Sequence, residues 1–305
     1  MKTKTIIRNI NPFNNSQEMP KALFAVKKLL AFFFIYIVSA VVGEAIIIGT
    51  LTAMGYDPLN GVMPTGYFAE LLPYYGFAVF FIVTLLYCKL VEKRNVKSFG
   101  FNKKGFDYIL GAVIAVLLLA VIVGASCLTG ALSFNFIATS VDPLYLTALF
   151  VAFFIQSFAE EVLCRGFLLK SLEKKAGLPL AIFVSSTAFA LPHLPSMLEA
   201  DFVFAVVGIL NLYLVSTVFS LLYMLRANIY VVGGLHCVWN FVLNGVMGLS
   251  VSGSNSNENA IMNFTVNSES ILNGGVYGLE ASVITTVVLG VVAFILVKMY
   301  RKRGI

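Results

Sequence analysis

The feature that most restricts the fold of this chain is a series of eight long apolar stretches. A helix needs about 20 residues to cross the ~30 Å hydrocarbon core of a bilayer, where it satisfies its own backbone groups. Hydrophobic residues make up 59% of the 305 residues, charged residues only 12%, and the mean hydropathy is +0.90. The sequence therefore predicts an all-α, polytopic integral membrane protein. The expected spans are 29–53, 71–91, 108–132, 144–171, 178–194, 202–225, 229–250 and 277–298.

The distribution of the 21 Lys and Arg residues supports this count and gives an orientation. They lie near both chain ends and at every second connection. The connections that contain neither residue are 54–70, 133–143, 195–201 and 251–276. Because cytoplasmic loops carry the Lys and Arg excess, both termini are predicted to be cytoplasmic. The net charge of +6 is explained by orientation and by attraction to anionic lipid, so no nucleic-acid binding is expected.

The predicted organisation is a basic cytoplasmic tail, residues 1–28, followed by a single transmembrane domain, residues 29–305. The apolar run after the tail is too long for a signal-peptide core, so the first span should stay in the mature protein. Segment 251–276, rich in Ser, Asn and Gly, is expected to be a flexible outer loop. The four cysteines are scattered and suggest neither a disulfide framework nor a zinc ribbon. Within the domain, segment 143–250 is the predicted catalytic core.

The fourth span carries an adjacent pair of carboxylates, Glu160 and Glu161, with Arg165 in the same helix. An ionisable side chain at the bilayer centre costs at least ~2.5–3.5 kcal/mol, so it usually marks a pathway, an ion pair or a reaction centre. Glu161 and Arg165 are four residues apart and share one helix face, which favours an ion pair. Glu160 points about 100° away and is free to act as a base or a ligand. An ion-pair network that only holds helices together is the alternative interpretation.

The only two histidines of the chain, His193 and His236, also lie in apolar spans. Pro192 should weaken the fifth span just before His193 and so aim its imidazole. Asn240 stands four residues after His236, on the same helix face, where the two side chains could donate hydrogen bonds to a developing oxyanion. The alternative is an interhelical hydrogen bond of about 1 kcal/mol. In the first span, Glu44 has an undecided role, structural or functional.

Counting residues from the inner ends of the helices places these groups at comparable depth. Glu160 lies 16 residues before the turn at 176–178 and His193 lies 15 after it, which puts both ~23 Å from the turn. His236 lies 8 residues, or ~12 Å, after Asn228. The depths of Glu160, His193 and His236 agree if the turn at 176–178, with the basic residues before it, projects ~10 Å into the cytoplasm. We therefore expect an active centre in the cytoplasmic half of the membrane.

The three motifs Glu-Glu-x-x-x-Arg, Phe-x-x-x-His and His-x-x-x-Asn, in this order on separate helices, resemble the CAAX-protease and bacteriocin-processing family of intramembrane proteases, which includes type II CAAX prenyl endopeptidases. The resemblance covers about residues 143–250. It implies that Glu160 and His193 activate a water, that Glu161 and Arg165 support the site, and that His236 and Asn240 stabilise the oxyanion.

The resemblance leaves metal dependence open, because the family has also been described as metal-dependent. Glu160, His193 and His236 are chemically adequate Zn²⁺ ligands with water as the fourth ligand. The sequence has no His-Glu-x-x-His helix that would favour such a site. Both a zinc metalloprotease and a metal-independent, glutamate-based hydrolase therefore fit the same residues.

The predicted function is intramembrane endopeptidase activity on a membrane-associated or lipidated protein or peptide near the cytoplasmic face. The compact chain favours a bacterial plasma membrane. The main alternative is a non-enzymatic scaffold or regulator that binds a partner peptide through the same polar cluster. A proton-coupled transporter is less favoured because no inverted repeat is visible. A thiol nucleophile at Cys164 or Cys237 is a further, weaker alternative.

Overall fold

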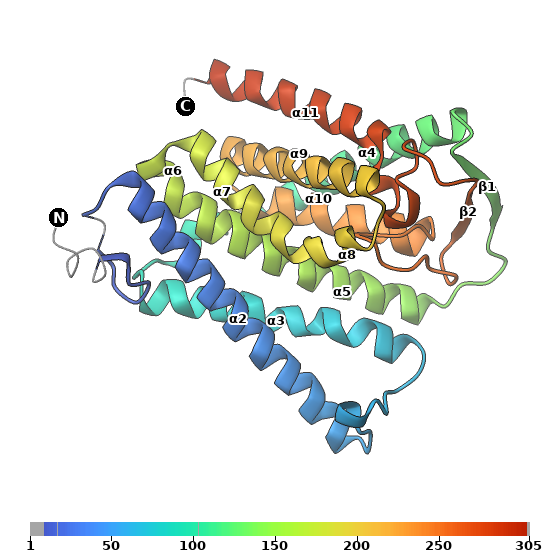
Figure 1. Ribbon diagram of the computed structural model, residues 1–305, viewed down its shortest axis with the longest axis horizontal. Coiled ribbons are helices and arrows are strands. Elements are labelled where there is room, and N and C mark those ends of the chain that lie inside the picture. Colours follow the sequence, from blue (N-terminus) through green and yellow to red (C-terminus); the bar gives the residue numbers. More distant parts are fainter. Residues whose placement is uncertain (1–8, 17, 103, 304–305) are drawn as a thin grey trace.

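The computed structural model describes residues 9–16, 18–102 and 104–303, so residues 1–8 and 17 of the expected tail lie outside the described part. Within that part the chain is mainly helical, and eight helices are long and apolar enough to cross a membrane, which confirms the predicted class (Figure 1). Five of them are single helices: α2 (Lys21–Ala53), α3 (Tyr67–Leu90), α4 (Asp107–Leu128), α9 (Phe202–Arg226) and α11 (Val283–Lys302). Three are composite: α5 (Pro143–Glu161) continues to Ala176, α7 (Leu178–Ala190) continues into α8 (Leu194–Leu198), and α10 (Ile229–Phe241) continues to Val246.

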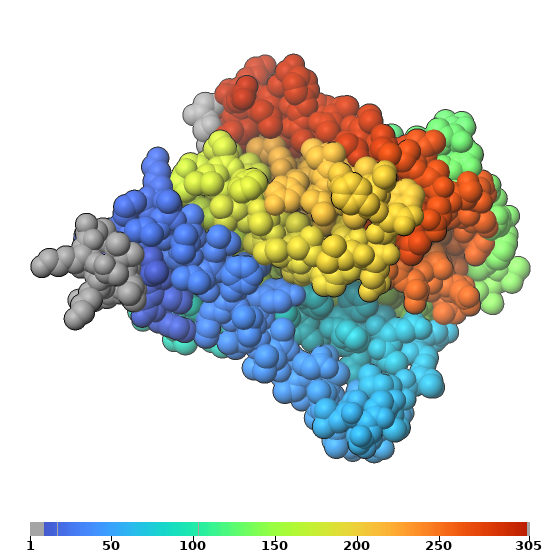
Figure 2. Space-filling view, viewed as in Figure 1, coloured from blue at the N-terminus to red at the C-terminus, as the bar shows by residue number. Residues whose placement is uncertain are grey.

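The helices form one bundle whose two ends differ in charge. The first residue of α2 and the last residue of α11 lie at the same end (Figure 1). The turns α3–α4, α6 (Lys170–Ala176)–α7 and α9–α10 also lie at this end, which therefore collects the basic residues of the chain. A space-filling view shows the start of α2, in blue, beside the yellow-green α6 at this end (Figure 2). We call this the basic end of the bundle.

Helix α2 begins at Lys21, eight residues before the predicted start of the first span at residue 29. The earlier start brings two lysines into the protein, where both are buried and paired. Lys27 donates to Asn14 Oδ1 and to the Ser16 carbonyl, both at 2.7 Å, and Lys28 pairs with Glu92. The first span was predicted to start too late because its lysines were taken to lie outside the apolar helix. A buried lysine is tolerated where it has partners.

The last span also begins later than predicted, at Val283 rather than at residue 277. Gly278 adopts a positive φ of 95°, which ends the preceding turn. Ser282 then caps the helix, because its hydroxyl accepts a hydrogen bond from the Thr285 amide at 3.1 Å.

The segment expected to be a flexible outer loop contains ordered structure. Strand β2 (Met262–Val266) pairs antiparallel with β1 (Leu132–Ile137), which follows α4 (Figure 1). The carboxylate of Glu280 accepts from Trp239 Nε1 at 2.9 Å and from the Ser252 amide at 2.5 Å. The connection between α10 and α11 is thereby held against α10, which sequence composition did not indicate.

Helices α4 and α10 pack at very short range because glycines face the neighbouring backbone. A Cβ atom on Gly111 of α4 would lie only 2.0 Å from the carbonyl oxygen of Val231. A Cβ atom on Gly234 of α10 would lie 2.3 Å from the Tyr108 carbonyl oxygen. Small residues allow such close backbone approach between transmembrane helices. Since α10 carries His236, this contact sets the position of one site histidine.

We predict that Gly111→Ala lowers the thermal unfolding temperature of the detergent-purified protein, because the added methyl group must push α4 from α10 at a cost of ~1–3 kcal/mol. The matched control is Gly124→Ala on the same helix, where a Cβ atom would meet nothing within 4 Å. The control variant should have the same unfolding temperature as the unsubstituted protein. Equal unfolding temperatures for the two variants would contradict the packing argument.

Candidate active site

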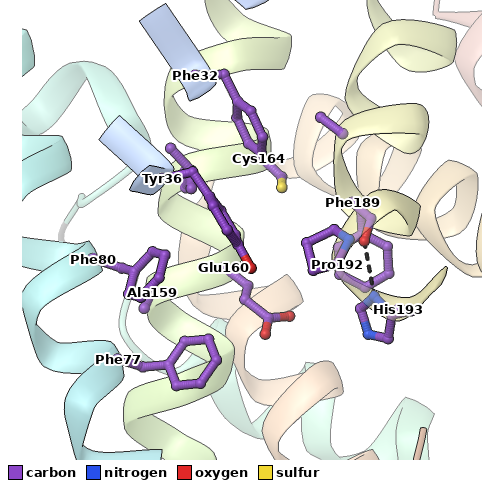
Figure 3. A pocket seen from close by; sticks show the side chains of 12 residues that line it. Phe32, Tyr36, Phe77, Phe80, Ala159, Glu160, Cys164, Phe189, Pro192 and His193 are labelled. Carbon is purple, nitrogen blue, oxygen red and sulfur yellow. Dashed lines mark hydrogen bonds between the residues drawn. The ribbon is translucent and has the colours of Figure 1, made fainter. Parts of the chain in front are cut away.

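A small cavity of about 50 Å³ lies inside the bundle, between α2, α3, α5 and α7 (Figure 3). Such a volume holds a few water molecules and no larger ligand. Its walls are mainly apolar and aromatic, with two ionisable side chains from the predicted motifs, Glu160 and His193. The lining residues are Phe32, Tyr36, Phe77, Phe80, Ala159, Glu160, Leu163, Cys164, Ala188, Phe189, Pro192 and His193.

The glutamate pair stands at the last turn of α5. The helix then continues without a break as a π-helical segment, Val162–Leu169, and as α6. All eight residues of the π-helical segment are buried. Such segments are rare and frequently occur at functional sites. Here the π-helical segment directly follows Glu160 and Glu161, the two carboxylates of the first sequence motif.

Glu161 and Arg165 form the predicted ion pair, and both side chains are fully buried. Arg165 Nη1 donates to Glu161 Oε1 at 2.9 Å. Its Nη2 donates to the hydroxyl of Ser216 on α9 at 2.7 Å. The guanidinium also lies over the rings of Phe189 and Phe219, at 4.5 and 5.1 Å from their centroids. The arginine thus ties α5, α7 and α9 together while it balances the charge of Glu161.

His236 of α10 bridges the two glutamates. Its Nδ1 lies 3.0 Å from Glu161 Oε1, and its Nε2 lies 3.9 Å from Glu160 Oε2. A carboxylate accepts and does not donate, so Nδ1 carries the proton of the hydrogen bond to Glu161. This bond fixes the ring and turns Nε2 toward Glu160.

His193 reaches the cavity from the opposite side. As predicted, the helix changes at Pro192: α7 ends at Ala190, and a 3₁₀ turn, Leu191–His193, follows. The Phe189 carbonyl lies 2.9 Å from His193 Nδ1, which must therefore be the donor. Figure 3 shows the imidazole and the Glu160 carboxylate facing the same space. In its neutral form His193 presents an unprotonated Nε2 there.

The carboxylate of Glu160 is only partly satisfied. Its Oε1 accepts from Gln156 Nε2 at 3.2 Å, whereas its Oε2 is buried without a hydrogen-bond partner among the described residues. A buried acceptor without a partner is costly, so it normally has a functional reason or an unseen water. Beside a cavity with room for water, the free oxygen is placed to hold one.

Other predicted residues are less closely connected to the cavity. Asn240 is buried on α10, but it does not line the cavity, and its amide has no hydrogen-bond partner in the described ranges. Glu44 is exposed on the C-terminal half of α2 and does not line the cavity. Cys164 does line the cavity, whereas Cys237 does not.

The residues proposed as zinc ligands do not fit a metal ion as they are arranged in the structure. Among the described residues, no three His, Cys, Asp or Glu side chains are grouped so that they could hold one. His236 does have the carboxylate partner on Nδ1 that metal-bound histidines commonly have. A zinc site would therefore require Glu160 and the two imidazoles to come together.

Sequence analysis missed the aromatic walls of the cavity and the residues that surround Arg165. Phe32 and Tyr36 come from α2, and Phe77 and Phe80 from α3, which the sequence analysis treated as plain hydrophobic spans. Nothing distinguishes these rings from lipid-facing ones in a single sequence. Ser216 left only a weak signal, as one of several small polar residues in α9.

We predict that Arg165→Met lowers the thermal unfolding temperature strongly, because it leaves the Glu161 carboxylate buried without its cation, a loss of ~3–5 kcal/mol. The matched control is Lys170→Met, which removes a pair with Glu173 whose side chains are 32% and 19% exposed. That pair should contribute less than ~1 kcal/mol. Similar losses in the two variants would contradict the assignment of Arg165 as the central cation.

Comparison with known proteins agrees with the sequence motifs. Residues 142–242 match the sequence model of a family described as Rce1-like, type II CAAX prenyl endopeptidase. A search of curated proteins gave no match to the chain. The matched segment contains all six site residues that the sequence motifs predicted. The helices that carry Glu160, His193 and His236 thus bear the sequence pattern of the Rce1-like type II CAAX prenyl endopeptidase family, which confirms the predicted resemblance.

Proposed function

We propose that this protein is an intramembrane endopeptidase that hydrolyses a peptide bond of a membrane-associated or lipidated substrate. The observation that carries the proposal is the free Oε2 of Glu160, which is buried, borders a water-sized cavity, and lies 3.9 Å from His236 Nε2. The family match over 142–242 implies a protease with a protein or peptide substrate.

The proposed reaction begins with a water in the cavity, held by the free oxygen of Glu160. The carboxylate accepts a proton from this water as the oxygen attacks the scissile carbonyl. His193 faces the same space with Nε2, so it can accept a hydrogen bond from the water and orient it. The proton taken up by Glu160 can then pass to the leaving amine, as general acid–base catalysis requires.

His236 is proposed to stabilise the oxyanion that forms during attack. Its Nδ1–H donates to Glu161, so donation from Nε2 to an oxyanion requires the doubly protonated imidazolium. Two carboxylate oxygens flank this ring: Glu161 Oε1 lies 3.0 Å from Nδ1, and Glu160 Oε2 lies 3.9 Å from Nε2. Asn240, one helical turn further on, is the proposed second donor and would have to turn toward the substrate.

A peptide substrate must displace part of the cavity wall, because about 50 Å³ holds only water. The wall on the side of α2 consists of Phe32 and Tyr36, and α2 and α3 form a hairpin outside the family match. Opening between this hairpin and α5 or α7 would admit a chain from the bilayer. A lipid-modified or membrane-bound peptide has the apolar character that this route requires.

Orientation and location are part of the proposal. The basic end of the bundle should face the cytoplasm, since Lys and Arg accumulate on that side. The active centre would then lie in the cytoplasmic half of the membrane, with both termini cytoplasmic. We propose a bacterial plasma membrane as the location.

We predict that Glu160→Gln reduces cleavage of a prenylated CAAX-type peptide at least ~10²-fold, because the amide cannot accept the proton of the water. His193→Ala and His236→Ala should have comparable effects. The control is Glu44→Gln, the exposed glutamate on α2, which should cleave normally. Initial rates of the purified variants in detergent, with unfolding temperatures to check the fold, provide the measurement.

The same experiment separates an enzyme from a scaffold that binds a peptide through the polar cluster. Full cleavage by folded Glu160→Gln would refute the catalytic assignment. If no variant and no unsubstituted protein cleaves, but the peptide binds equally to all of them, the scaffold interpretation is supported.

The arrangement of the site also predicts the effect of metal removal. Because no described group of three side chains is placed to hold an ion, we expect cleavage to persist after dialysis against EDTA and 1,10-phenanthroline. Elemental analysis of the purified protein is the parallel measurement. A loss of activity that added Zn²⁺ restores, together with one zinc per chain, would instead show that the enzyme depends on zinc, and Glu160, His193 and His236 would be its candidate ligands.

A further inference from the structure

A second pocket, of about 370 Å³, lies at the basic end of the bundle, between the start of α2, the turn after α3, and α6. Figure 2 shows α2 and α6 side by side there. We name it the basic pocket. Five cationic side chains line it against a single carboxylate. Its lining residues are Asn15, Phe24, Lys28, Glu92, Arg94, Ser98, Lys170, Ser171, Lys174 and Lys175.

Arg94 belongs to the frame of the pocket. Its five N–H donors are all engaged, with Glu92, Ser98 (side chain and carbonyl), Ser171 and the Gly166 carbonyl. These bonds join the turn after α3 to the π-helical segment and α6. Arg94 therefore contributes charge and rigidity to the pocket, and no further donors.

In contrast to Arg94, the lysines of the basic pocket keep N–H donors that can bind a ligand. Lys28 pairs with Glu92 and Lys170 pairs with Glu173, whereas Lys174 and Lys175 have no ion pair or hydrogen bond in the part of the chain that the structure describes. After Glu92 and Glu173 are counted, the pocket keeps an excess of three positive charges. Such an excess in a walled pocket selects an anion with several acceptor oxygens.

Two ammonium groups also converge on one aromatic ring. Lys28 Nζ lies 5.1 Å and Lys175 Nζ 4.9 Å from the centroid of Phe24. Both distances are within cation–π range, so Phe24 helps to hold two positive charges at the wall of the basic pocket. Lys28 is almost fully buried, so its charge is poorly screened by water.

We propose that the basic pocket binds the phosphate group of an anionic phospholipid. The pocket lies where the apolar surface of α2 begins: Val26 and Leu30, at the same height as Lys28, are exposed, as side chains in contact with acyl chains would be. A headgroup phosphate at this height fits clustered lysines at the end of membrane helices. A free phosphate ion shares this chemistry but gains nothing from the adjacent apolar surface.

The lipid site goes beyond the proposed protease function and does not depend on it. It does have a structural link to the active site. Phe24 and Lys28 lie on the same face of α2 as Phe32 and Tyr36, at successive steps of four residues. A lipid bound between α2 and α6 would hold the helix that forms one wall of the catalytic cavity.

The test uses the full-length protein in a neutral detergent and short-chain phosphatidylglycerol as the probe, with binding followed by native mass spectrometry. Phosphatidylglycerol should bind at least ~10-fold more tightly than phosphatidylcholine of the same chain length. The double variant Lys174→Glu/Lys175→Glu should lose this preference. The matched control, Lys89→Glu/Lys97→Glu, changes two exposed lysines at the same end that do not line the pocket, and it should keep the preference.

The outcomes distinguish a lipid site from general surface charge and from a site for a soluble anion. Equal binding of the two lipids, or equal loss in both double variants, overturns the proposal, because the effect would then be general surface charge. Displacement of phosphatidylglycerol by millimolar inorganic phosphate, with direct phosphate binding of similar strength, assigns the pocket to a soluble anion and overturns the lipid assignment. An unchanged unfolding temperature shows that each variant is folded, and binding does not require the protein to cleave any substrate.

Discussion

The arrangement of the core depends on one fully buried ion pair, Glu161 with Arg165. Removing two charges from water is costly, and the cost is recovered only when each charge has further partners. Here the arginine also binds Ser216 and lies between two phenylalanine rings, and the glutamate also binds His236. A pair of this kind cannot shift without losing several contacts at once. It therefore fixes α5, α7, α9 and α10 relative to one another.

This fixed core explains why the adjacent Glu160 has a different environment from Glu161. Glu161 takes up the cation and the Nδ1 proton of His236, so neither is available to neutralise Glu160. Glu160 is left with one weakly bound oxygen and one free oxygen beside the cavity. Two neighbouring residues of the same type thus have different roles because they face different directions on one helix. Glu161 takes part in the buried ion pair, and Glu160 is the residue to which we assign the chemistry in the proposed function.

Much of this could be predicted from the sequence, and the exceptions have physical causes. The eight spans, the Glu161–Arg165 pair and the helix break at Pro192 follow from hydropathy, helical spacing and the missing N–H of proline, and the structure confirms them. The start of α2 was misplaced because burial of Lys27 and Lys28 depends on partners far along the chain. The strand pair β1–β2 and the aromatic cavity walls were missed because they arise from contacts between distant segments. The roles of Asn240 and of zinc remain predictions.

The length of α2 has a consequence for the environment in which the protein works. Its 33 residues extend ~50 Å, well beyond the ~30 Å hydrocarbon thickness, and Figure 1 shows the helix running obliquely to its neighbours. A helix that exceeds the bilayer adapts by tilting, and the tilt follows membrane thickness. Since Phe32 and Tyr36 sit on this helix, a thinner or thicker membrane changes the inclination of the wall that a substrate must pass. If substrate enters as proposed, lipid chain length is a physical variable that acts on access to Glu160.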